Sequence, residues 1–411
     1  MSVFFSFLCF CSMMNNLFAF INIRRLKTYQ APAQVQLKPG KKLYLILKVY
    51  QETAQIRQTI ARLSQDLAPF ENVTVLIIGT IKERDSSGRN PTLELAQQAV
   101  RNNTLFHILE CPIVGTHAHQ NNYAIASIKT DPKNTWIMTL DIDTDVTQDG
   151  FKAFIEAINA DRLIIQQTAF FLSNYAKVDF FQKGNAVYQS RWKIIQELKR
   201  VQLNKWTHGW FLLNAVGHGL CINLKEMQAL NGFSEAVPIE DVALGYVISA
   251  MNKRMDALPV IELADVPTTW KAGFKQKITW AYGPMYFPIY YKRFRQEHPA
   301  AYQANKLRAF VIMLEGFYAY FAWCLISPVI LGAIFCALSG SVSAVAFLAF
   351  YCLEYGQSVH LFIHKYRLKT SFWKALAAGL CESLLISWPA LAALGILCIK
   401  KAPVKFKTEH V

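Results

Sequence analysis

The chain has 411 residues, of which 53% are hydrophobic and 17% are charged. Soluble domains carry about 25% charged residues, so this composition excludes an ordinary soluble enzyme and indicates a membrane protein. The net charge of +15 suits anionic lipid headgroups, a phosphorylated substrate or nucleic acid, and the aromatic content of 13% excludes an intrinsically disordered chain.

The first segment, from Val3 to Asn22, is apolar and contains no charged residue. It is long enough to cross the hydrocarbon core of a bilayer, which needs about 20 residues. Basic residues follow it, beginning with Arg24. A cleaved signal peptide, the alternative interpretation, carries positive charge before its apolar region. We therefore expect a transmembrane anchor over residues 1–23, after which the chain enters the cytoplasm.

Residues 42–283 alternate strand-like apolar runs with helix-like patterns. We predict strands at residues 43–50, 73–78, 136–140, 163–167 and 258–263. Helical periodicity covers residues 52–67 and 92–100. This alternation predicts an α/β domain with a mostly parallel sheet. Ligands of such sheets bind beyond the carboxyl ends of the strands, so acids at strand ends are the candidates for chemistry.

Three acids, Asp141, Asp143 and Asp145, follow the predicted strand 136–140. The alternation of side chains along an extended backbone puts Asp141 and Asp143 on the same side. There they can face a divalent cation whose remaining ligands are water and substrate phosphates. The alternative interpretation is a solvated acidic turn.

Two further groups of residues are candidates for a site. Glu240 and Asp241 open an apolar helix, where either catalysis or ordinary helix capping explains an acidic pair. Gln276 lies four residues before Trp280, whose indole face is suited to a sugar ring, although a buried structural tryptophan is the alternative.

The C-terminal part of the sequence again has membrane character. Residues 284–310 interleave aromatic residues with Lys292, Arg293 and Arg295, which predicts an interfacial segment or, alternatively, a linker packed on the domain. Residues 311–400 contain three candidate spans, at 317–338, 342–363 and 375–399. If every candidate span crosses the membrane once, the C-terminal tail lies outside the cell. Its four lysines then break the rule that basic residues lie on the cytoplasmic side. Either the last segment is re-entrant or a tight hairpin, or the tail is an exception; the lysines are Lys400, Lys401, Lys405 and Lys407.

The acids, the Gln-x-x-x-Trp pattern and the spans occur in one fixed succession. In this order the chain resembles the family 2 glycosyltransferases, specifically the membrane-embedded polysaccharide synthase branch that includes cellulose, hyaluronan and chitooligosaccharide synthases. The resemblance runs from about Leu43 to Trp280 and extends to the membrane arrangement. It implies an α/β, Rossmann-like GT-A domain in the cytoplasm, with one N-terminal and about three C-terminal transmembrane helices in the cell inner (plasma) membrane.

The resemblance also implies roles for individual residues. Asp141 and Asp143 match the D-x-D motif that binds the donor diphosphate, with Mg²⁺ or Mn²⁺ held on Asp143. Asp241, with Glu240 beside it, matches the general base. Tyr50 fits the start of the donor-binding first-strand segment.

Further positions of the chain match the donor and acceptor segments of the family. Glu52 completes the donor-binding segment that begins at Tyr50. Gln276 and Trp280 match the Q-x-x-R-W signature at the acceptor end. A glycine-containing acceptor segment corresponds to Gly217, His218 and Gly219, and a Leu-Asn-x-Ala helix start corresponds to Asn122-Tyr123-Ala124.

The chain also departs from the family pattern. Thr279 replaces the arginine of the signature, and His117 stands in place of a lysine. The second strand lacks its aspartate pair, for which Glu83 and Asp85 are the candidate substitutes. His117 and His119 suggest a metal pair if they lie on a strand, and polar loop residues otherwise.

The implied activity is that of a hexosyltransferase. It transfers a sugar, with inversion, from a nucleotide sugar such as a UDP-sugar to a glycan or lipid-linked acceptor in polysaccharide synthesis. The second hypothesis is a transferase that adds one sugar to a lipid-linked acceptor. The third hypothesis is a non-catalytic assembly subunit. We expect no nucleic-acid partner.

Overall fold

The computed structural model describes residues 2–101, 103–400 and 403. The chain divides into two compact units. One unit consists of residues 30–168 and 213–262, and the other consists of residues 1–29, 169–212 and those from 263 onward. The predicted domain of residues 42–283 thus contributes to both units, and each unit is described by itself.

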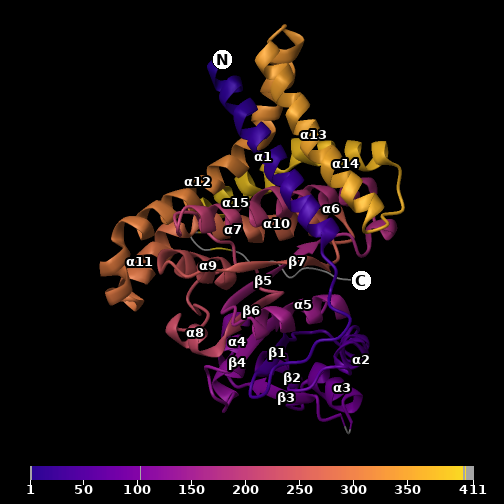
Figure 1. Ribbon diagram of the computed structural model, residues 1–411, viewed down its shortest axis with the longest axis vertical. Coiled ribbons are helices and arrows are strands. Elements are labelled where there is room, and N and C mark those ends of the chain that lie inside the picture. Colours follow the sequence, from indigo (N-terminus) through magenta and orange to yellow (C-terminus); the bar gives the residue numbers. More distant parts are fainter. Residues whose placement is uncertain (1, 102, 401–402, 404–411) are drawn as a thin grey trace. The chain divides into compact units, whose positions relative to one another are not determined.

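The first unit is built on a seven-stranded sheet with the order β3-β2-β1-β4-β6-β5-β7 (Figure 1). Strands β3, β2, β1 and β4 are parallel, whereas β6 runs antiparallel to both β4 and β5. The α/β sheet predicted from the sequence is therefore confirmed, as a mixed sheet whose parallel part is β3-β2-β1-β4. The strands are β1 (Lys42–Lys48), β2 (Val73–Thr80), β3 (Phe106–Cys111), β4 (Thr135–Leu140), β5 (Ile164–Phe170), β6 (Leu220–Asn223) and β7 (Asp256–Leu263).

Helices connect these strands and bury one apolar face each. In α2, Ile56, Ile60, Leu63 and Leu67 recur at the helical spacing and are buried. A side-chain cap fixes the start of α5, where the Thr147 hydroxyl accepts the Gly150 N–H. The helices are α2 (Ile56–Leu67), α3 (Pro91–Ala99), α4 (His117–Ser127), α5 (Gln148–Asn159), α8 (Leu224–Ala229) and α9 (Glu240–Ala250).

Several predicted boundaries were wrong. The first strand ends at Lys48 rather than Tyr50, because the chain turns at Gln51, whose φ is 57°. The helix predicted from residue 52 therefore begins only at Ile56. Strands β3 and β6 were not predicted at all.

The direction of β6 decides which segments meet at one edge of the sheet. The carboxyl ends of the parallel strands β1, β2 and β4 lie at the same edge. Because β6 is antiparallel, its first residue, Leu220, pairs with Thr139 near the end of β4. The segment that precedes Leu220 therefore reaches the same edge as the acids that follow β4.

The second unit is helical, and its described residues contain four helices or helix pairs that are long and apolar enough to span a membrane: Ser2–Thr28, Pro299–Leu338, Val342–His364 and Phe372–Lys400. The predicted N-terminal span and three C-terminal spans are thus confirmed. The last span is two helices that meet at Ile386, and Lys401, Lys405 and Lys407 lie outside the described residues. The helices are α1 (Ser2–Thr28), α6 (Phe180–Trp192), α7 (Leu198–Trp206), α10 (Trp270–Met285), α11 (Phe287–Glu297), α12 (Pro299–Leu338), α13 (Val342–His364), α14 (Phe372–Leu385) and α15 (Ser387–Lys400).

Helix α11 falls in the predicted interfacial segment and is amphipathic. Phe287, Tyr290 and Phe294 are buried, whereas Lys292 and Arg295 are exposed. The helix packs against α12. Both features agree with a segment that lies along a membrane surface with its basic residues in water.

Polar contacts join the helices of the second unit. α1 and α13 lie side by side (Figure 1). The buried Arg191 of α6 pairs with the buried Glu354 of α13 at 2.6 Å, and the Ser12 hydroxyl of α1 donates to the same carboxylate at 2.7 Å. A charge inside a span is tolerated when it is paired, so this cluster binds α6 to α1 and α13.

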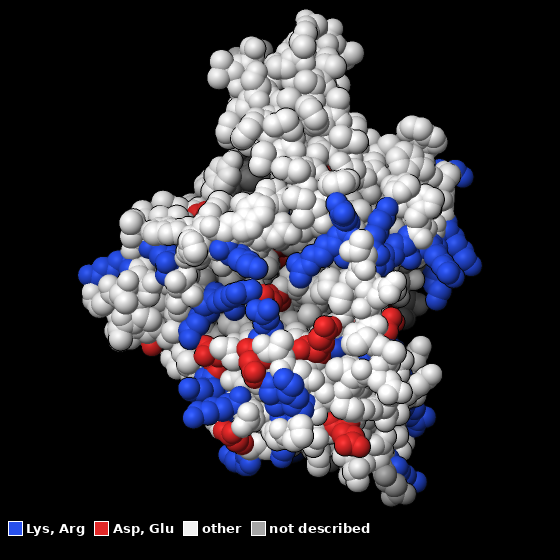
Figure 2. Space-filling view, viewed as in Figure 1, with Lys and Arg blue, Asp and Glu red and all other residues white. Residues whose placement is uncertain are grey.

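Charged side chains are unevenly distributed over this helical unit. Figure 2 shows no Lys, Arg, Asp or Glu on the visible face around the N-terminal part of α1 and the adjoining part of α13, whereas Lys and Arg gather where these helices end. Such a boundary between apolar and basic surface is typical of the place where a helix leaves the bilayer.

Candidate active site

Asp141 and Asp143 directly follow β4, as the sequence predicts, in a turn that is fixed by hydrogen bonds. The Asp141 N–H donates to the Thr144 hydroxyl at 3.0 Å, and the Thr144 N–H donates to the Asp141 carbonyl at 3.1 Å. From α2, the Thr59 hydroxyl donates to the Ile142 carbonyl at 2.9 Å. Both acids are half-buried, so their carboxylates are held at the sheet edge by an ordered backbone.

A buried lysine at the end of β1 neutralises the first of these acids. Lys48 Nζ lies 2.7 Å from Asp141 Oδ1 and donates to the Gly217 carbonyl at 2.8 Å. Burial lowers the pKa of Lys48, whereas Asp141, Glu240 and Asp241 together raise it, and the net shift is upward. Burial likewise raises the pKa of Asp141, while Lys48 and then His218 lower it, to about 2. The pair therefore stays ionised at neutral pH.

Asp241 lies in the first turn of α9, and two backbone N–H groups hold its carboxylate. Gly217 N donates to Oδ2 at 2.7 Å, and Val242 N donates to Oδ1 at 2.8 Å. Burial raises the pKa of Asp241 to about 6, and the Glu240 charge adds to this effect. A Cβ at position 217 would lie 3.2 Å from Oδ2, so glycine permits the close approach. Asp241 is thus a carboxylate poised to take up a proton near neutral pH.

Gly217 connects the two acidic motifs. Its carbonyl accepts from Lys48, which pairs with Asp141, and its N–H donates to Asp241. The structure therefore brings together Asp141, Gly217 and Asp241, three of the residues that the sequence selected, through a lysine to which no role had been assigned.

His218 and Gly219 form a second contact at this edge. His218 Nδ1 lies 2.5 Å from Oε1 of Glu262, which is fully buried at the end of β7. Burial raises the pKa of Glu262, and the nearby His218 lowers it by less. Gly219 has a φ of +63°, and a Cβ there would lie 2.7 Å from Glu262 Oε2. Glycine is therefore required beside this carboxylate for both conformation and space.

Gln166 of β5 fixes the loop that carries Gly217 and His218. Its Oε1 accepts the Val216 N–H at 3.0 Å, and its Nε2 donates to the His218 carbonyl at 3.0 Å. The side chain is buried. A loop held on both sides of Gly217 keeps the connection between Asp141 and Asp241 in one geometry.

The predicted donor residues Tyr50 and Glu52 lie just beyond β1. The Glu52 N–H donates to the Thr92 hydroxyl at 3.1 Å, and Lys82 Nζ lies 5.1 Å from the centre of the Tyr50 ring. Glu83, one of the two candidate substitutes for the missing aspartate pair, accepts the Gln51 N–H at 2.7 Å. The other candidate, Asp85, instead binds Ser87 and Arg89. Of the two, Glu83 is the acid beside the donor residues.

The two histidines at 117 and 119 lie in the first turn of α4 and not on a strand. The metal-pair interpretation depended on alternate strand positions and is therefore wrong. His119 Nδ1 accepts the Thr116 N–H at 3.2 Å, and its Nε2 lies 3.4 Å from Glu235. Asn122 is in the middle of α4 rather than at its start, and it binds the backbone of Phe233 and the Glu235 carboxylate. α4 thus holds the loop that leads to Glu240 and Asp241.

Gln276 and Trp280 both lie on α10, which belongs to the helical unit. They are four residues apart and therefore share one helix face. Gln276 is buried, and the ring of the half-buried Trp280 is 6.0 Å from that of Phe171. Between them, the Thr279 hydroxyl donates to the Lys275 carbonyl at 3.3 Å, which is an ordinary helical contact.

A divalent cation at the acidic edge would find few protein ligands. Within residues 2–101, 103–400 and 403, no three His, Cys, Asp or Glu side chains form a ready metal cluster. Mg²⁺ bound with a nucleotide usually needs only one or two carboxylates, because phosphates and waters complete its shell. Asp143 can supply one such carboxylate, and Asp141 beside it pairs with Lys48.

Two residues of this edge, Lys48 and Glu262, were missed as site residues. Each is a buried charged side chain at or near the end of a strand whose central residues are mostly apolar. A buried charge needs a partner, so this pattern was the signal in the sequence that could have identified them.

The family model described as Glycosyl transferase family group 2 matches residues 136–399, more than half of the chain. The chain belongs to this family. It is therefore a glycosyltransferase that uses a nucleotide sugar, with a GT-A type α/β sheet and candidate transmembrane helices on both sides of it in the sequence. The match begins at Trp136 in β4 and so includes the D-x-D acids, Asp241 and the C-terminal helices.

Many solved structures are similar to this glycosyltransferase, and two of them serve as examples. The mannosyltransferase PcManGT from Pyrobaculum calidifontis, in complex with GDP-Man and Mn²⁺, has 14% identity and a TM-score of 0.46, with 93% of this chain and 99% of that chain covered. S. aureus TarS 1–349 has 11% identity and a TM-score of 0.42, with 89% and 94% covered. No curated protein sequence matches the chain.

The Lys48–Asp141 pair makes a testable contribution to stability. We expect Lys48→Met to lower the midpoint of thermal unfolding by about 5 °C, because the half-buried Asp141 carboxylate loses its counter-charge. In Lys48→Met/Asp141→Asn that carboxylate is absent, so part of the loss should be recovered. Thermal unfolding of the parent, the single variants Lys48→Met and Asp141→Asn, and the double variant in detergent measures the coupling, and strictly additive effects would show that the pair does not interact.

Proposed function

We propose that this glycosyltransferase is an inverting hexosyltransferase that acts at the cytoplasmic face of the inner membrane. Its donor is a nucleotide diphosphate sugar, probed first as a UDP-sugar, and its acceptor is a glycan or a lipid-linked saccharide in polysaccharide synthesis. The observation that carries the proposal is the connection of Asp141 to Asp241 through Lys48 and Gly217. It supports one site in which donor and acceptor groups meet.

In the proposed reaction, Asp241 accepts the proton of the attacking acceptor hydroxyl. The oxygen forms a bond to the anomeric carbon as the bond to the diphosphate breaks. The raised pKa of Asp241, about 6, makes its carboxylate a stronger base than an exposed aspartate and still leaves it mostly ionised at neutral pH. Glu240 supports this role through its charge.

Asp141 and Asp143 are proposed to receive the donor diphosphate, with Tyr50 and Glu52 nearer the nucleotide. A bound Mg²⁺ or Mn²⁺ neutralises negative charge on the leaving diphosphate. Asp143 would hold this ion. Asp141 does not need the ion as a counter-charge, because Lys48 already neutralises it. We propose that Gly217, His218 and Gly219, together with Gln276 and Trp280, contact the acceptor.

The test is the transfer product. Full-length protein in detergent or vesicles is incubated with Mn²⁺ and a panel of nucleotide sugars, and products are analysed by mass spectrometry. A ladder that extends by one hexose per step supports polymer synthesis, and a single added hexose on a lipid-linked acceptor supports the runner-up. Absence of transfer to any acceptor, from protein that binds no nucleotide sugar, would contradict the proposal and favour an assembly subunit.

The pH dependence of the reaction provides an independent prediction. We expect kcat/KM to rise with pH through about 6 and then level off, because the base must be ionised and the pKa of Asp241 is raised to about 6. Glu240→Gln removes a charge that raises this pKa, so the rise should move to lower pH. Initial rates across a pH series measure both profiles, and an unchanged midpoint in the variant would contradict the coupling.

The proposed location predicts which loops are accessible from outside the cell. Ser86→Cys adds an exposed thiol in the sheet-containing unit, and Ser339→Cys adds one in the turn between α12 and α13. With a membrane-impermeant maleimide on intact cells, we expect labelling of Ser339→Cys only. The parent measures the background from its exposed cysteines Cys352, Cys381 and Cys398, and external labelling of Ser86→Cys would reverse the assigned sidedness.

A further inference from the structure

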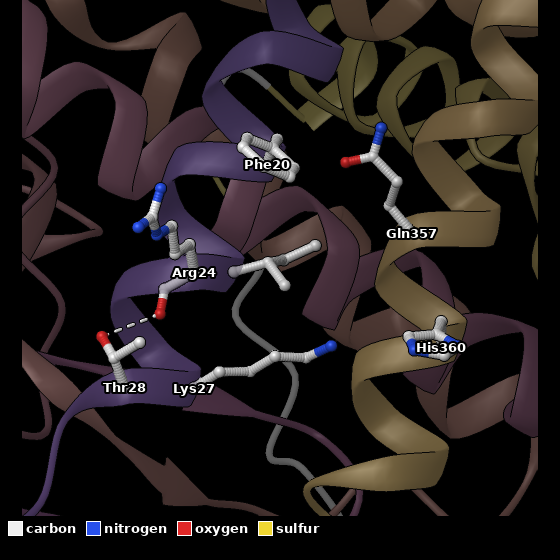
Figure 3. A pocket seen from close by; sticks show the side chains of 7 residues that line it. Phe20, Arg24, Lys27, Thr28, Gln357 and His360 are labelled. Atoms are coloured by element: carbon white, nitrogen blue, oxygen red, sulfur yellow. Dashed lines mark hydrogen bonds between the residues drawn. The ribbon is translucent and has the colours of Figure 1, made fainter.

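A groove of about 440 Å³ lies between α1 and α13 in the helical unit. Its lining includes Phe20, Arg24 and Lys27 of α1 and Gln357 and His360 of α13 (Figure 3). The Lys27 side chain extends toward α13 (Figure 3). No step of the proposed transfer reaction uses any of these residues.

The groove has two chemically different ends along α1. Phe20 and Ile23 supply an apolar wall within the candidate span, and Arg24 is the first charged residue of the chain. Lys27 follows within one turn. At 1.5 Å per residue, about 10 Å separates Phe20 from Lys27, which is the scale of a lipid headgroup together with its first methylene groups.

In the described part of the chain, the basic end of the groove has no acidic partner. Among the described residues that line it there is no Asp or Glu, and neither Arg24 nor Lys27 has a described carboxylate within ion-pair distance. Glu354 of α13 is already occupied by Arg191 and Ser12. At the far wall, the His360 ring stacks at 4.2 Å on His364. The groove therefore offers positive charge that an anion can neutralise.

We propose that this groove binds one anionic phospholipid of the surrounding membrane. Its phosphate contacts Arg24 and Lys27, and an acyl chain lies on Phe20 and Ile23. A free phosphate would leave the apolar wall unused. An acidic peptide would have to enter at a place where α1 and α13 leave the bilayer and where lipid is already concentrated. The lipid would hold α1 against α13, independently of the proposed sugar transfer.

The first test uses the full chain in vesicles of phosphatidylglycerol or phosphatidylcholine with identical acyl chains. After extraction and washing in detergent, native mass spectrometry counts the lipids that remain bound. We expect one retained phosphatidylglycerol and no retained phosphatidylcholine. Arg24→Gln/Lys27→Gln should reduce retention about ten-fold or more, because each basic residue contributes to binding of anionic lipid.

Matched variants separate the groove from general surface charge and from simple phosphate binding. Lys292→Gln/Lys306→Gln also removes two exposed positive charges, on α11 and α12, and should retain the lipid fully. Arg24→Lys/Lys27→Arg keeps the charge and should do the same. Phe20→Ala keeps the charge but removes apolar wall, and should weaken retention.

Three results would overturn the proposal. The first is equal retention of the two lipids by the parent, which would show that the phosphate charge is not selected. The second is an equal loss of lipid in the α11/α12 control. The third is displacement of the lipid by millimolar inorganic phosphate with no effect of Phe20→Ala, which would indicate an anion site only.

Discussion

Asp241→Asn should lower the turnover of sugar transfer by about 10²- to 10⁴-fold while donor binding changes little, because an amide cannot accept the hydroxyl proton. The change keeps the size of the side chain and one of the two acceptors that bind Gly217 and Val242. Initial rates at saturating donor measure turnover, and equilibrium binding of the nucleotide sugar to the same preparation is the control.

A purely structural role for Asp241 predicts a different outcome. Asn is about as good as Asp at the start of a helix, so a helix-capping residue should tolerate the replacement. Turnover of Asp241→Asn within a few-fold of the parent would therefore remove this residue from the proposed chemistry. Loss of donor binding together with turnover would instead indicate a collapsed site.

Asp143→Ala should abolish the part of nucleotide-sugar binding that depends on Mg²⁺ or Mn²⁺. The acid follows β4 in an ordered turn, and Asp141 beside it is already neutralised by Lys48. Removal of the Asp143 carboxylate therefore leaves the ion without its protein ligand at this edge. Titration of the nucleotide sugar with and without the metal measures the difference.

Asp145→Ala is the matched control for this change, because it removes a third acid from the same turn. Asp145 accepts the Thr147 N–H at 3.3 Å, which is a local contact before α5. We expect metal-dependent binding by the Asp145 variant to stay within a few-fold of the parent. Unchanged metal dependence in Asp143→Ala would exclude Asp143 as the ligand.

The elements that were predicted correctly are continuous apolar runs, which can be recognised from consecutive residues alone. β1, β2 and β4 are apolar runs that are buried throughout almost their whole length, and the candidate spans are long uncharged segments. β3 was missed because its burial is incomplete and its residues include His107 and Glu110. β6 was missed because it has four residues, too few for a periodic pattern, and depends on pairing with distant strands.

Helix α6 could not be predicted because its buried residues are mostly polar. Gln182, Asn185, Gln189 and Arg191 are buried there, although polar residues ordinarily indicate an exposed surface. Their burial depends on partners elsewhere in the chain, such as Glu354 of α13. A sequence pattern does not reveal such a partner.

In the candidate site, too, some residues could be selected from the sequence and others could not. Asp141, Asp143 and Asp241 could be selected because their order along the chain resembles that of the family 2 glycosyltransferases; acids at a strand end or at a helix start, taken alone, are as well explained by a solvated turn or by helix capping. Lys48 could not be assigned a role, because that role depends on β1 lying beside β4 and on the antiparallel β6 returning Gly217 to the same edge. The topology, and not the local sequence, creates this connection.

The stereochemistry of transfer tests the central claim most directly. If Asp241 activates the acceptor hydroxyl for a single displacement at the site beside Asp141, the anomeric configuration must invert. Full-length protein is supplied with an α-linked nucleotide sugar and an acceptor, and the first product is analysed by NMR spectroscopy. We predict a β-linked sugar in the parent and no product above background in Asp241→Asn. An α-linked product would contradict the single-displacement reaction and the role of Asp241 in it.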